Sequence, residues 1–403
     1  MSNHEIFKAA QNGKGQNLFS LNIAHFFLLT TYFSLLTSVG ADTHYVSLSG
    51  SNTPPYTNWA EAATNIQDAI DAASVGDTVW VTNGIYDTGG RTLLDVDWAG
   101  NRVAVTGAMF VAGVNGPSFT RIVGTNGMRC AYVANGAVLS GFTLAGGCLN
   151  NLGQSEHANG GGAYCEGAGV ISNCVITGCR LDHGGSGGGV FGGTAVHCVM
   201  NFNMVEYGNG GGMAHGLAVD CAICENSGYQ GGGTAHNTNM SCLIDGNHAN
   251  SVGGGTVFSA NRACRIIGND AENGGGTWAG ENVSSAIMGN QCLYGGGGSS
   301  LDVNRNCTII DNVADLGGGT SGSTNYNCIV YYNSARLAYP NWQNGCLGYS
   351  CTTPLPEGEG NLTSEPALMG LRNPRLLAPS PCRDAGSDSL SVWATDLDGG
   401  SRT

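Results

Sequence analysis

Acidic side chains recur at one place in this chain, eight residues after a regularly spaced cysteine. Asp182 and Glu206 hold that place in successive repeats, and Glu225 lies near it in the next. Two stacked carboxylates could bind a calcium ion, or could shift each other's pKa values apart for acid–base catalysis. We therefore take Asp182, Glu206 and Glu225 as candidate catalytic residues, and Asp182 and Glu206 as candidate calcium ligands. The alternative, which we favour, is a solvated edge that keeps the protein soluble, because catalytic acids need a degree of burial.

Histidine and cysteine also offer ligands at regular spacing. His215 and His236 each stand three residues after a glycine triplet, and Phe258 holds the same place in the following repeat. Because an apolar ring shares the column and no third ligand is apparent, packing is favoured over a metal site. Cys221 and Cys224 form a single C-x-x-C pair with no partner pair, which is a weak signal for zinc or redox chemistry.

The chain has 16 cysteines, seven of them in one column of the repeat. Regularly stacked, inward-facing cysteines would have to distort the chain to pair with one another. Cys346 and Cys351 lie outside the column and flank a four-residue turn, so they are the candidate disulfide.

These residues sit on an internal repeat whose step is mostly 21 or 22 residues. Glycine triplets mark it, and each repeat also carries a cysteine, an apolar residue two positions later and an asparagine five positions later. The triplets start at Gly160, Gly187, Gly210, Gly231, Gly253, Gly274, Gly295 and Gly317. The cysteine column is Cys174, Cys198, Cys221, Cys242, Cys264, Ser285, Cys307 and Cys328. The asparagine column is Asn203, Asn226, Asn247, Asn269, Asn290, Asn312 and Asn333. A repeat of this length predicts a solenoid.

The spacing of two between the inward residues is that of a strand, and glycine triplets would interrupt any helix. We therefore predict an all-β fold, a right-handed parallel β-helix of about 11 or 12 coils over residues 77–335. Cysteine and isoleucine should face inward, asparagine amides should hydrogen-bond along the axis, and the glycines should supply positive φ at a corner. Apolar residues at helical spacing within residues 59–73 predict a helix that caps the open end of the core.

The amino-acid composition excludes several classes of protein and of mechanism. Charged residues make up 11% of the chain and glycine supplies 67 residues, which excludes a helical bundle rich in ion pairs. The formal net charge of −14 argues against nucleic acid as a partner. The only lysines are Lys8 and Lys14, so a mechanism with a lysine base is excluded for the chain after position 41.

An apolar run between residues 18 and 36 ends in small residues, with Val39 and Ala41 at the −3 and −1 positions of a cleavage site. This pattern predicts a secretory signal over residues 1–41; the alternative is an uncleaved anchor helix. We expect an N-terminal strand and capping helix over residues 42–76, the β-helix over 77–335 and an irregular segment over 336–403. The mature chain should hold no transmembrane helix.

The segment around residues 65–86, with the motifs NIQDAI…GDTV…GIY, resembles the opening of right-handed parallel β-helix proteins of the pectate-lyase-like superfamily. The GGG…CxIxxN repeats are similar to those of polymorphic outer-membrane proteins and related bacterial surface proteins. The segment 380–399, with SPCRDAG…TDLDG, is similar to the closing segment of secreted bacterial β-helix proteins. In those relatives the chain continues into another strand and often a sorting anchor, so this resemblance implies truncation at Thr403.

Together these observations predict an exported, non-catalytic β-helix, secreted or held at the cell surface or outer membrane. We expect it to act as a monomer that binds glycans or partner proteins along its side. No cofactor is expected, apart from calcium if the acidic edge holds it. The competing hypothesis is a polysaccharide lyase or glycosidase that acts on an acidic polysaccharide.

Overall fold

The computed structural model describes residues 40–93, 99–150, 159–391 and 397. Most of the predicted signal segment, residues 1–39, therefore lies outside the described residues. The chain divides into two compact units, Met1–Ala222 and Ile223–Thr403, which are described in turn. The described residues form a parallel β-solenoid of about 10 turns, close to the 11 or 12 coils expected.

Unit 1 is built from coils whose strands pair in parallel with those of the next coil, apart from the antiparallel pair β4–β5. Its sheet 1 contains β1 (Thr43–Val46), β2 (Thr78–Val81), β6 (Phe110–Gly113), β9 (Val138–Ser140), β13 (Val170–Ser172), β17 (Thr194–Val196) and β21 (Leu217–Val219). Its sheet 2 contains β3 (Gly84–Tyr86), β7 (Thr120–Val123), β10 (Thr143–Ala145), β14 (Val175–Thr177) and β18 (Val199–Asn201). Its sheet 3 contains β11 (Cys148–Leu149), β15 (Arg180–Leu181) and β19 (Met204–Val205). Its sheet 4 contains β4 (Arg91–Thr92), β5 (Gly100–Val105), β8 (Met128–Val133), β12 (Ala163–Cys165), β16 (Val190–Phe191) and β20 (Met213–Ala214).

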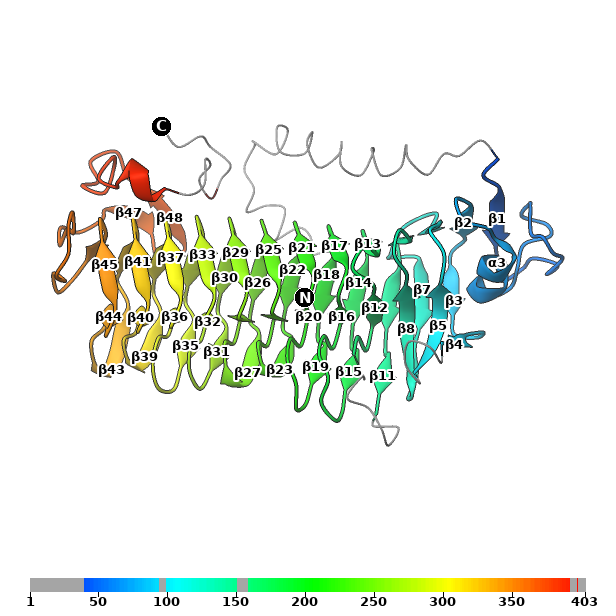
Figure 1. The fold of residues 1–403 in the computed structure, drawn as a ribbon, viewed down its shortest axis with the longest axis horizontal. Coiled ribbons are helices and arrows are strands. Elements are labelled where there is room, and N and C mark those ends of the chain that lie inside the picture. Colours follow the sequence, from blue (N-terminus) through cyan, green and yellow to red (C-terminus); the bar gives the residue numbers. More distant parts are fainter. Residues whose placement is uncertain (1–39, 94–98, 151–158, 392–396, 398–403) are drawn as a thin grey trace. The chain divides into compact units, whose positions relative to one another are not determined.

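Unit 2 repeats the same order of four strands per coil, and strand β22 (Ala222–Cys224) lies at the division between the units. Sheet 1 of unit 2 contains β25 (Thr238–Met240), β29 (Ala260–Arg262), β33 (Glu281–Val283), β37 (Val303–Arg305), β41 (Thr324–Tyr326) and β45 (Cys346–Gly348). Sheet 2 contains β26 (Leu243–Asp245), β30 (Arg265–Ile267), β34 (Ala286–Met288), β38 (Thr308–Ile310), β42 (Ile329–Tyr331) and β46 (Cys351–Thr352). Sheet 3 contains β23 (Ser227–Gln230), β27 (His248–Val252), β31 (Asp270–Ala271), β35 (Gln291–Cys292), β39 (Val313–Leu316) and β43 (Ser334–Ala338). Sheet 4 contains β24 (Thr234–Ala235), β28 (Thr256–Val257), β32 (Thr277–Trp278), β36 (Ser299–Ser300), β40 (Thr320–Ser321) and β44 (Trp342–Gln343). Figure 1 shows strands such as β25, β29 and β33 side by side.

Corners with left-handed backbone separate the four strands of a coil. In one coil of unit 2, Gly253 (φ +66°), Phe258 (φ +48°), Ala263 (φ +51°) and Gly268 (φ +62°) stand at the four corners. The first glycine of a triplet is required sterically as well, since a Cβ on Gly253 would lie 2.4 Å from the carbonyl oxygen of Thr256. The predicted role of the glycine triplets is therefore confirmed.

The cysteine and isoleucine columns form the core, as predicted. Cys264 and Ile266 are fully buried, and the register aligns Ile244 with Ile266 in the next coil. The Cys264 thiol donates a hydrogen bond to the carbonyl oxygens of Arg262 and Asn239, both at 3.3 Å. Burial is the first cause that holds the pKa of this thiol well above its usual value. The ladder cysteines therefore behave as small hydrophobic residues with a weak donor.

The predicted asparagine ladder is present in unit 2. Nδ2 of Asn269 donates to Oδ1 of Asn290 at 2.9 Å, and Asn247 makes the same bond to Asn269 at 2.9 Å. A second ladder, which we did not predict, lies three residues before the cysteine column and links Asn239, Asn261, Asn282, Asn304 and Asn325. Each of its amides also donates to a buried hydroxyl five residues earlier, as Asn261 does to Thr256 at 3.0 Å.

One carboxyl group lies inside unit 2 beside this second ladder. Asp302 is 1% exposed and accepts hydrogen bonds from Thr277 and Ser299, both at 2.7 Å, and from the Gly280 amide at 2.5 Å. Burial raises its pKa above the usual value, although these hydrogen bonds work in the opposite direction.

We expect the Asp302→Asn variant to be stabilised relative to the wild type as the pH rises. A carboxyl whose pKa is raised by folding contributes stability below its unfolded pKa and loses that contribution as the pH passes its folded pKa. Thermal melts between pH 4 and 8 test this, with Asp311→Asn as the control that removes a charge from an exposed position. The expectation would be contradicted if the melting temperature of the Asp302→Asn variant, relative to that of the wild type, did not change with pH or fell as the pH rose.

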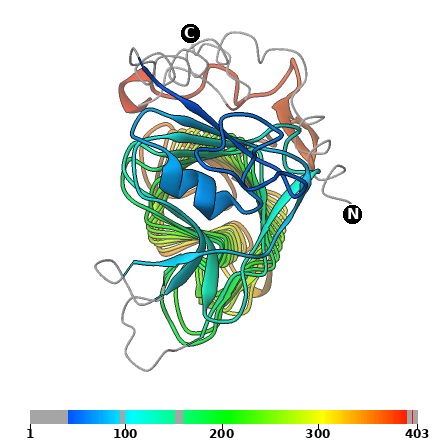
Figure 2. The same cartoon turned by 90° about the vertical axis from the view of Figure 1, so that its right-hand side faces the viewer.

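The predicted cap is present in unit 1 but its helix is shorter than expected. Helix α3 (Ile66–Ala72) begins after Asn65, whose side chain accepts a hydrogen bond from the Asp68 amide at 2.9 Å. It buries Ile66, Ala69 and Ile70, and Figure 2 shows it lying across the end of the first coils. The asparagine N-cap fixes its start, so residues 59–65 are not helical.

The coils of unit 2 continue beyond residue 335, where we expected irregular structure. Strands β44, β45 and β46 pair in parallel with β40, β41 and β42. No glycine triplet marks this coil, but the carbonyl oxygens of Pro340 and Asn341 still accept hydrogen bonds from the Gly319 and Thr320 amides. Ser350 takes the cysteine place and accepts a hydrogen bond from the Cys328 amide at 3.1 Å.

Candidate functional site: an uncharged aromatic face and a carboxylate pocket

The acidic pair of the sequence does lie on neighbouring coils of unit 1. Asp182 follows β15 and Glu206 follows β19, and the Glu206 amide donates to the Leu181 carbonyl at 3.0 Å. The Asp182 carboxylate, however, forms a two-pronged ion pair with Arg180, at 2.7 and 2.9 Å. Glu206 is exposed to solvent. This arrangement favours a solvated, neutralised edge over a calcium site or a catalytic pair.

Glu225 belongs to unit 2, where it stands at a left-handed corner (φ +55°) with its side chain exposed. Its charge acts on two neighbours. Burial and then Glu225 raise the pKa of Asp245, and burial followed by the charges of Asp245 and Glu225 raises the pKa of Cys224 to about 12. Within the described residues, no group of three or more histidines, cysteines or carboxylates could hold a metal ion.

Cys346 and Cys351 lie on different sheets of unit 2. Cys346 begins β45 and is exposed, whereas Cys351 begins β46 of sheet 2 and is 3% exposed, with the left-handed corner at Tyr349 between them. Both are free thiols, and the Cys351 thiol contacts Cys382.

The histidine column belongs to a run of aromatic rings on sheet 4. In unit 2, His236 stacks on Phe258 with ring centroids 5.0 Å apart, and Phe258 meets Trp278 edge to face at 5.1 Å and 79°. In unit 1, His215 lies 5.3 Å from Phe191. These contacts agree with the packing interpretation of the two histidines.

In unit 2 the run of rings ends at Trp278, whose register partner in the next coil is the small Ser300. Phe258 is 43% exposed, Leu301 is 56% exposed and Trp278 is partly exposed. On the next coils of sheet 4 the register position of Trp278 is held by residues with hydroxyl or amide groups, and the Ser321 hydroxyl donates to Gln343 Oε1 at 3.3 Å. We call this set the aromatic face; it consists of Phe258, Trp278, Ser300, Leu301, Ser321 and Gln343.

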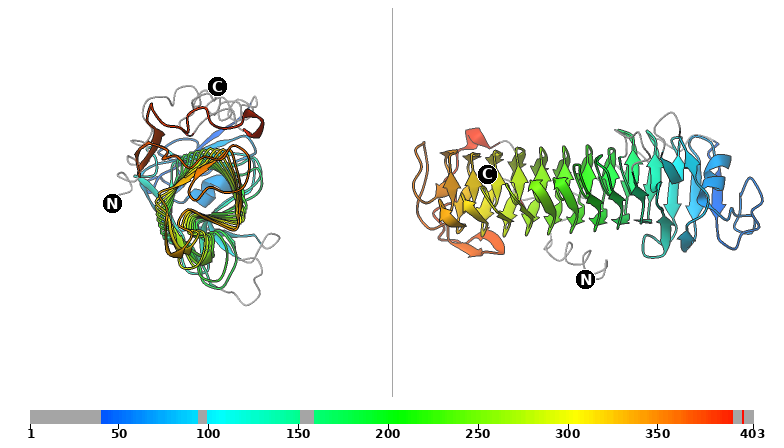
Figure 3. Two further views of the ribbon diagram at one scale, coloured as in Figure 1. Left: turned by 90° about the vertical axis from the view of Figure 1, so that its left-hand side faces the viewer. Right: turned by 90° about the horizontal axis from the view of Figure 1, so that it is seen from below.

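The aromatic face carries no charge. None of the described strands of sheet 4 in unit 2 contains an ionisable side chain. Viewed from below in Figure 3, the strands of this unit lie side by side, so that equivalent positions recur coil after coil. Exposed aromatic rings flanked by uncharged hydrogen-bonding groups are typical of a binding surface.

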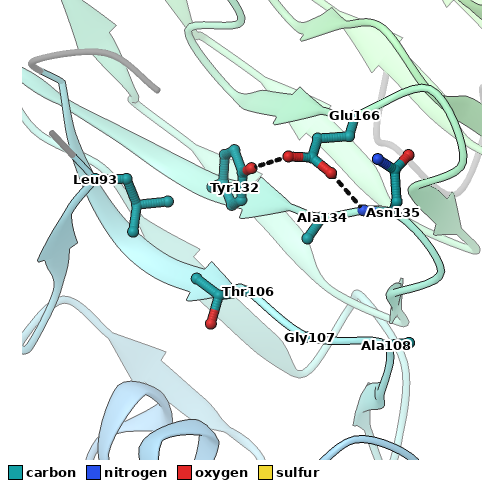
Figure 4. Close-up of a pocket in the computed structure, with 8 residues that line it drawn as sticks. All are labelled: Leu93, Thr106, Gly107, Ala108, Tyr132, Ala134, Asn135 and Glu166. Carbon is teal, nitrogen blue, oxygen red and sulfur yellow. Dashed lines mark hydrogen bonds between the residues drawn. The ribbon is translucent and has the colours of Figure 1, made fainter. Parts of the chain in front are cut away.

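A pocket of about 360 Å³ opens on sheet 4 of unit 1 (Figure 4). The Tyr132 hydroxyl donates to the Glu166 carboxylate, whose second oxygen accepts the Asn135 amide at 2.8 Å. The remaining lining residues are Leu93, Thr106, Gly107, Ala108 and Ala134. Glu166 is the only carboxylate among the described residues of the lining. A glycosidase needs two carboxylates flanking the bond, so this pocket is better suited to binding than to hydrolysis.

Sequence reasoning missed most of the aromatic face. Phe258 and Leu301 stand three residues after their glycine triplets, but Trp278 stands only two after its own. A search allowing either offset would have found Tyr164, Phe191 and Trp278 together. The Tyr132–Glu166 contact joins residues 34 apart through the irregular early coils, and no periodic signal points to it.

Comparison with known proteins gives no family. No family model matches the chain, and no curated protein matches it. Among solved structures, pectate lyase Pel9A aligns at a TM-score of 0.41 and 12% identity, over 90% of this chain and 88% of that one. Pectin methylesterase PemA from Erwinia chrysanthemi aligns at 0.32 and 12%, over 76% and 93%. The A-module of mannuronan C-5 epimerase AlgE6 from Azotobacter vinelandii aligns at 0.31 and 14%, over 70% and 94%. Likenesses this distant carry no argument about activity. In the described part of the chain, no helix has the length and apolar character needed to cross a membrane.

Proposed function

We propose that this protein is an exported, non-catalytic β-helix that binds polysaccharide through the aromatic face of unit 2. The supporting observation is the end of the aromatic run at Trp278. Its indole meets Phe258 edge to face on one side, and the small Ser300 follows on the other. A sugar ring can place its C–H-rich face on such an indole while its hydroxyls bond to neighbouring side chains.

The chemistry of the face favours a neutral glycan. Sheet 4 of unit 2 offers hydroxyls and an amide but no cation to pair with a uronate. The net charge of −14 would also repel a polyanion at low ionic strength. The proposed ligand is therefore a neutral polysaccharide.

Two further observations support binding without turnover. The acidic column has Asp182 bound to Arg180 and Glu206 exposed, and the unit 1 pocket contributes Glu166 alone among its described lining residues. The proposal of export rests on the signal pattern of residues 1–41. A secreted protein would meet polysaccharides outside the cell, which fits the proposed ligand.

Replacing Trp278 by Ser should weaken binding to neutral polysaccharide by about five- to thirtyfold, since loss of a stacked aromatic ring costs on the order of 1–2 kcal/mol. Affinity electrophoresis in gels containing β-glucan, xylan or galactomannan measures the effect. Tyr294→Ser, which removes a ring that is 53% exposed outside the aromatic face, is the matched control. Equal retardation of the Trp278→Ser variant and the wild type would refute the site, provided both proteins melt at the same temperature.

A further inference from the structure

Two cysteines outside the core ladder meet where the C-terminal segment folds back onto the coils of unit 2. Cys351 lies on the outer side of sheet 2, because its strand neighbour Thr352 aligns with the inward Val330. Its thiol donates to the Ser364 carbonyl at 3.1 Å and is hydrogen-bonded to the thiol of Cys382. Cys382 is only partly buried, so a reagent in solvent can reach it.

Within the C-terminal segment, hydrogen bonds hold residues 377–382 against residues 366–367. The Ser380 hydroxyl donates to the Pro366 carbonyl, and the Cys382 amide donates to the Ser380 hydroxyl at 3.2 Å. The Leu377 amide reaches the Ala367 carbonyl at 2.9 Å. These bonds hold the residues before Cys382 against residues 366–367, which closely follow the Ser364 carbonyl that the Cys351 thiol contacts.

Beyond Cys382 the segment docks on the outside of the coils (Figure 3, left). Asn327 exchanges two hydrogen bonds of 2.9 Å with the Ser387 backbone, and Asn306 donates to Ser391 at 3.2 Å. The part of the segment before Cys382 also docks there. Leu368 begins β47 (Leu368–Gly370), which pairs antiparallel with β48 (Asn373–Leu376), and its side chain packs on the apolar cluster of Met288 and Ile310. These contacts are non-covalent, so a covalent link would strengthen the docking.

We propose that Cys351 and Cys382 form a disulfide that fastens the C-terminal segment to the coils of unit 2, with a small-molecule disulfide as the oxidant. The Cys382 thiolate attacks one sulfur of the oxidant and releases one thiolate. Cys351 then loses its proton and attacks the Cys382 sulfur, which releases the second thiolate. Two protein thiols are oxidised and one small disulfide is reduced to two thiols, so the exchange is balanced.

The electrostatics support this order of attack. Hydrogen bonding with Cys351 lowers the pKa of Cys382, whereas contact with Cys382, followed by burial, raises the pKa of Cys351. The thiolate is the nucleophile in disulfide exchange, so Cys382 is the entry point. The ladder cysteines are buried and inert by comparison.

The test is to incubate the purified, reduced chain with oxidised glutathione, unfold it, alkylate the free thiols and measure the intact mass. The expected product has 14 alkylated thiols, the 16 of the chain less the two that are linked, and digestion yields one peptide pair joining Cys351 to Cys382. The link should raise the melting temperature of the oxidised protein by about 5–10 °C over the reduced protein, an effect that dithiothreitol reverses.

Cys346→Ser is the matched control, because it removes an exposed neighbouring thiol and should leave both the link and the shift intact. Cys382→Ser should abolish both. Sixteen alkylated thiols after exposure to the oxidant, or a link that maps to Cys346 and Cys351, would overturn the proposal. The mapping of wild-type peptides does not depend on any variant folding, and its outcome is independent of whether the aromatic face binds glycan.

Discussion

Replacing Ile244 by Asp should unfold the coils of unit 2. Ile244 is fully buried in β26 and aligns with Ile266 of the next coil. A carboxylate at this place would have no polar partner within the apolar column, and burying an unpaired charge is among the most destabilising changes known. The expected loss in the free energy of unfolding is about 4 kcal/mol or more.

Thermal melting followed by far-ultraviolet circular dichroism measures this loss. Leu243→Asp is the control, because it places the same residue on the same strand at a half-buried position that alternates with the core. If the Ile244→Asp protein, like the control, melted at the temperature of the wild type, Ile244 would not face the core, and the assignment of the isoleucine column to the inner face of sheet 2 would be wrong.

Replacing Asn269 by Asp should have the second largest effect. Its Nδ2 donates to the Ile244 carbonyl at 3.0 Å and to Asn290 Oδ1 at 2.9 Å. Aspartate has the same shape but cannot donate when ionised, so the Ile244 carbonyl loses this side-chain donor and a carboxylate oxygen faces the oxygen of Asn290. Asn290 Oδ1 keeps the hydrogen bond from the Asn269 backbone amide at 2.9 Å. Losing these bonds and burying a charge without a donor should together cost about 3 kcal/mol or more in the free energy of unfolding.

The same melts, compared with Asn250→Asp at an exposed position of unit 2, measure the cost of breaking the ladder. We expect the loss for Asn269→Asp to shrink as the pH falls toward 4, because burial raises the pKa of the new carboxyl and its protonated form can donate again. A loss no larger than that of the control would show that the asparagine column does not stabilise the coils.

The periodic parts of the molecule could be predicted from the sequence, since a solenoid stacks identical places above one another. The cysteine column, the asparagine column and the positive φ at the glycine triplets were all predicted in this way. The second asparagine ladder was missed because its place is held by Ile171, Ala195 and Ala218 in unit 1, so that the column reads as apolar over half its length.

The candidate site was harder to predict, because it depends on departures from the period. Trp278 sits one residue earlier than Phe258 relative to its triplet, and the planes of the two rings meet at 79°. The Arg180–Asp182 ion pair follows from a spacing of two along one strand, and the sequence alone could have suggested it. The contact between Cys351 and Cys382 could not be predicted, because an irregular segment without a repeat joins them.

The most direct test of the central claim is to incubate the purified protein with neutral polysaccharides and with polygalacturonate, and to follow binding and turnover together. Sedimentation with the insoluble fraction reports binding, while ultraviolet absorbance of unsaturated uronates and release of reducing ends report turnover. We predict retention on at least one neutral polysaccharide, with no product from any of them in the presence of calcium. Product formation that disappears in the Asp182→Asn, Glu206→Gln variant would contradict the account and make the acidic edge of unit 1 an active site.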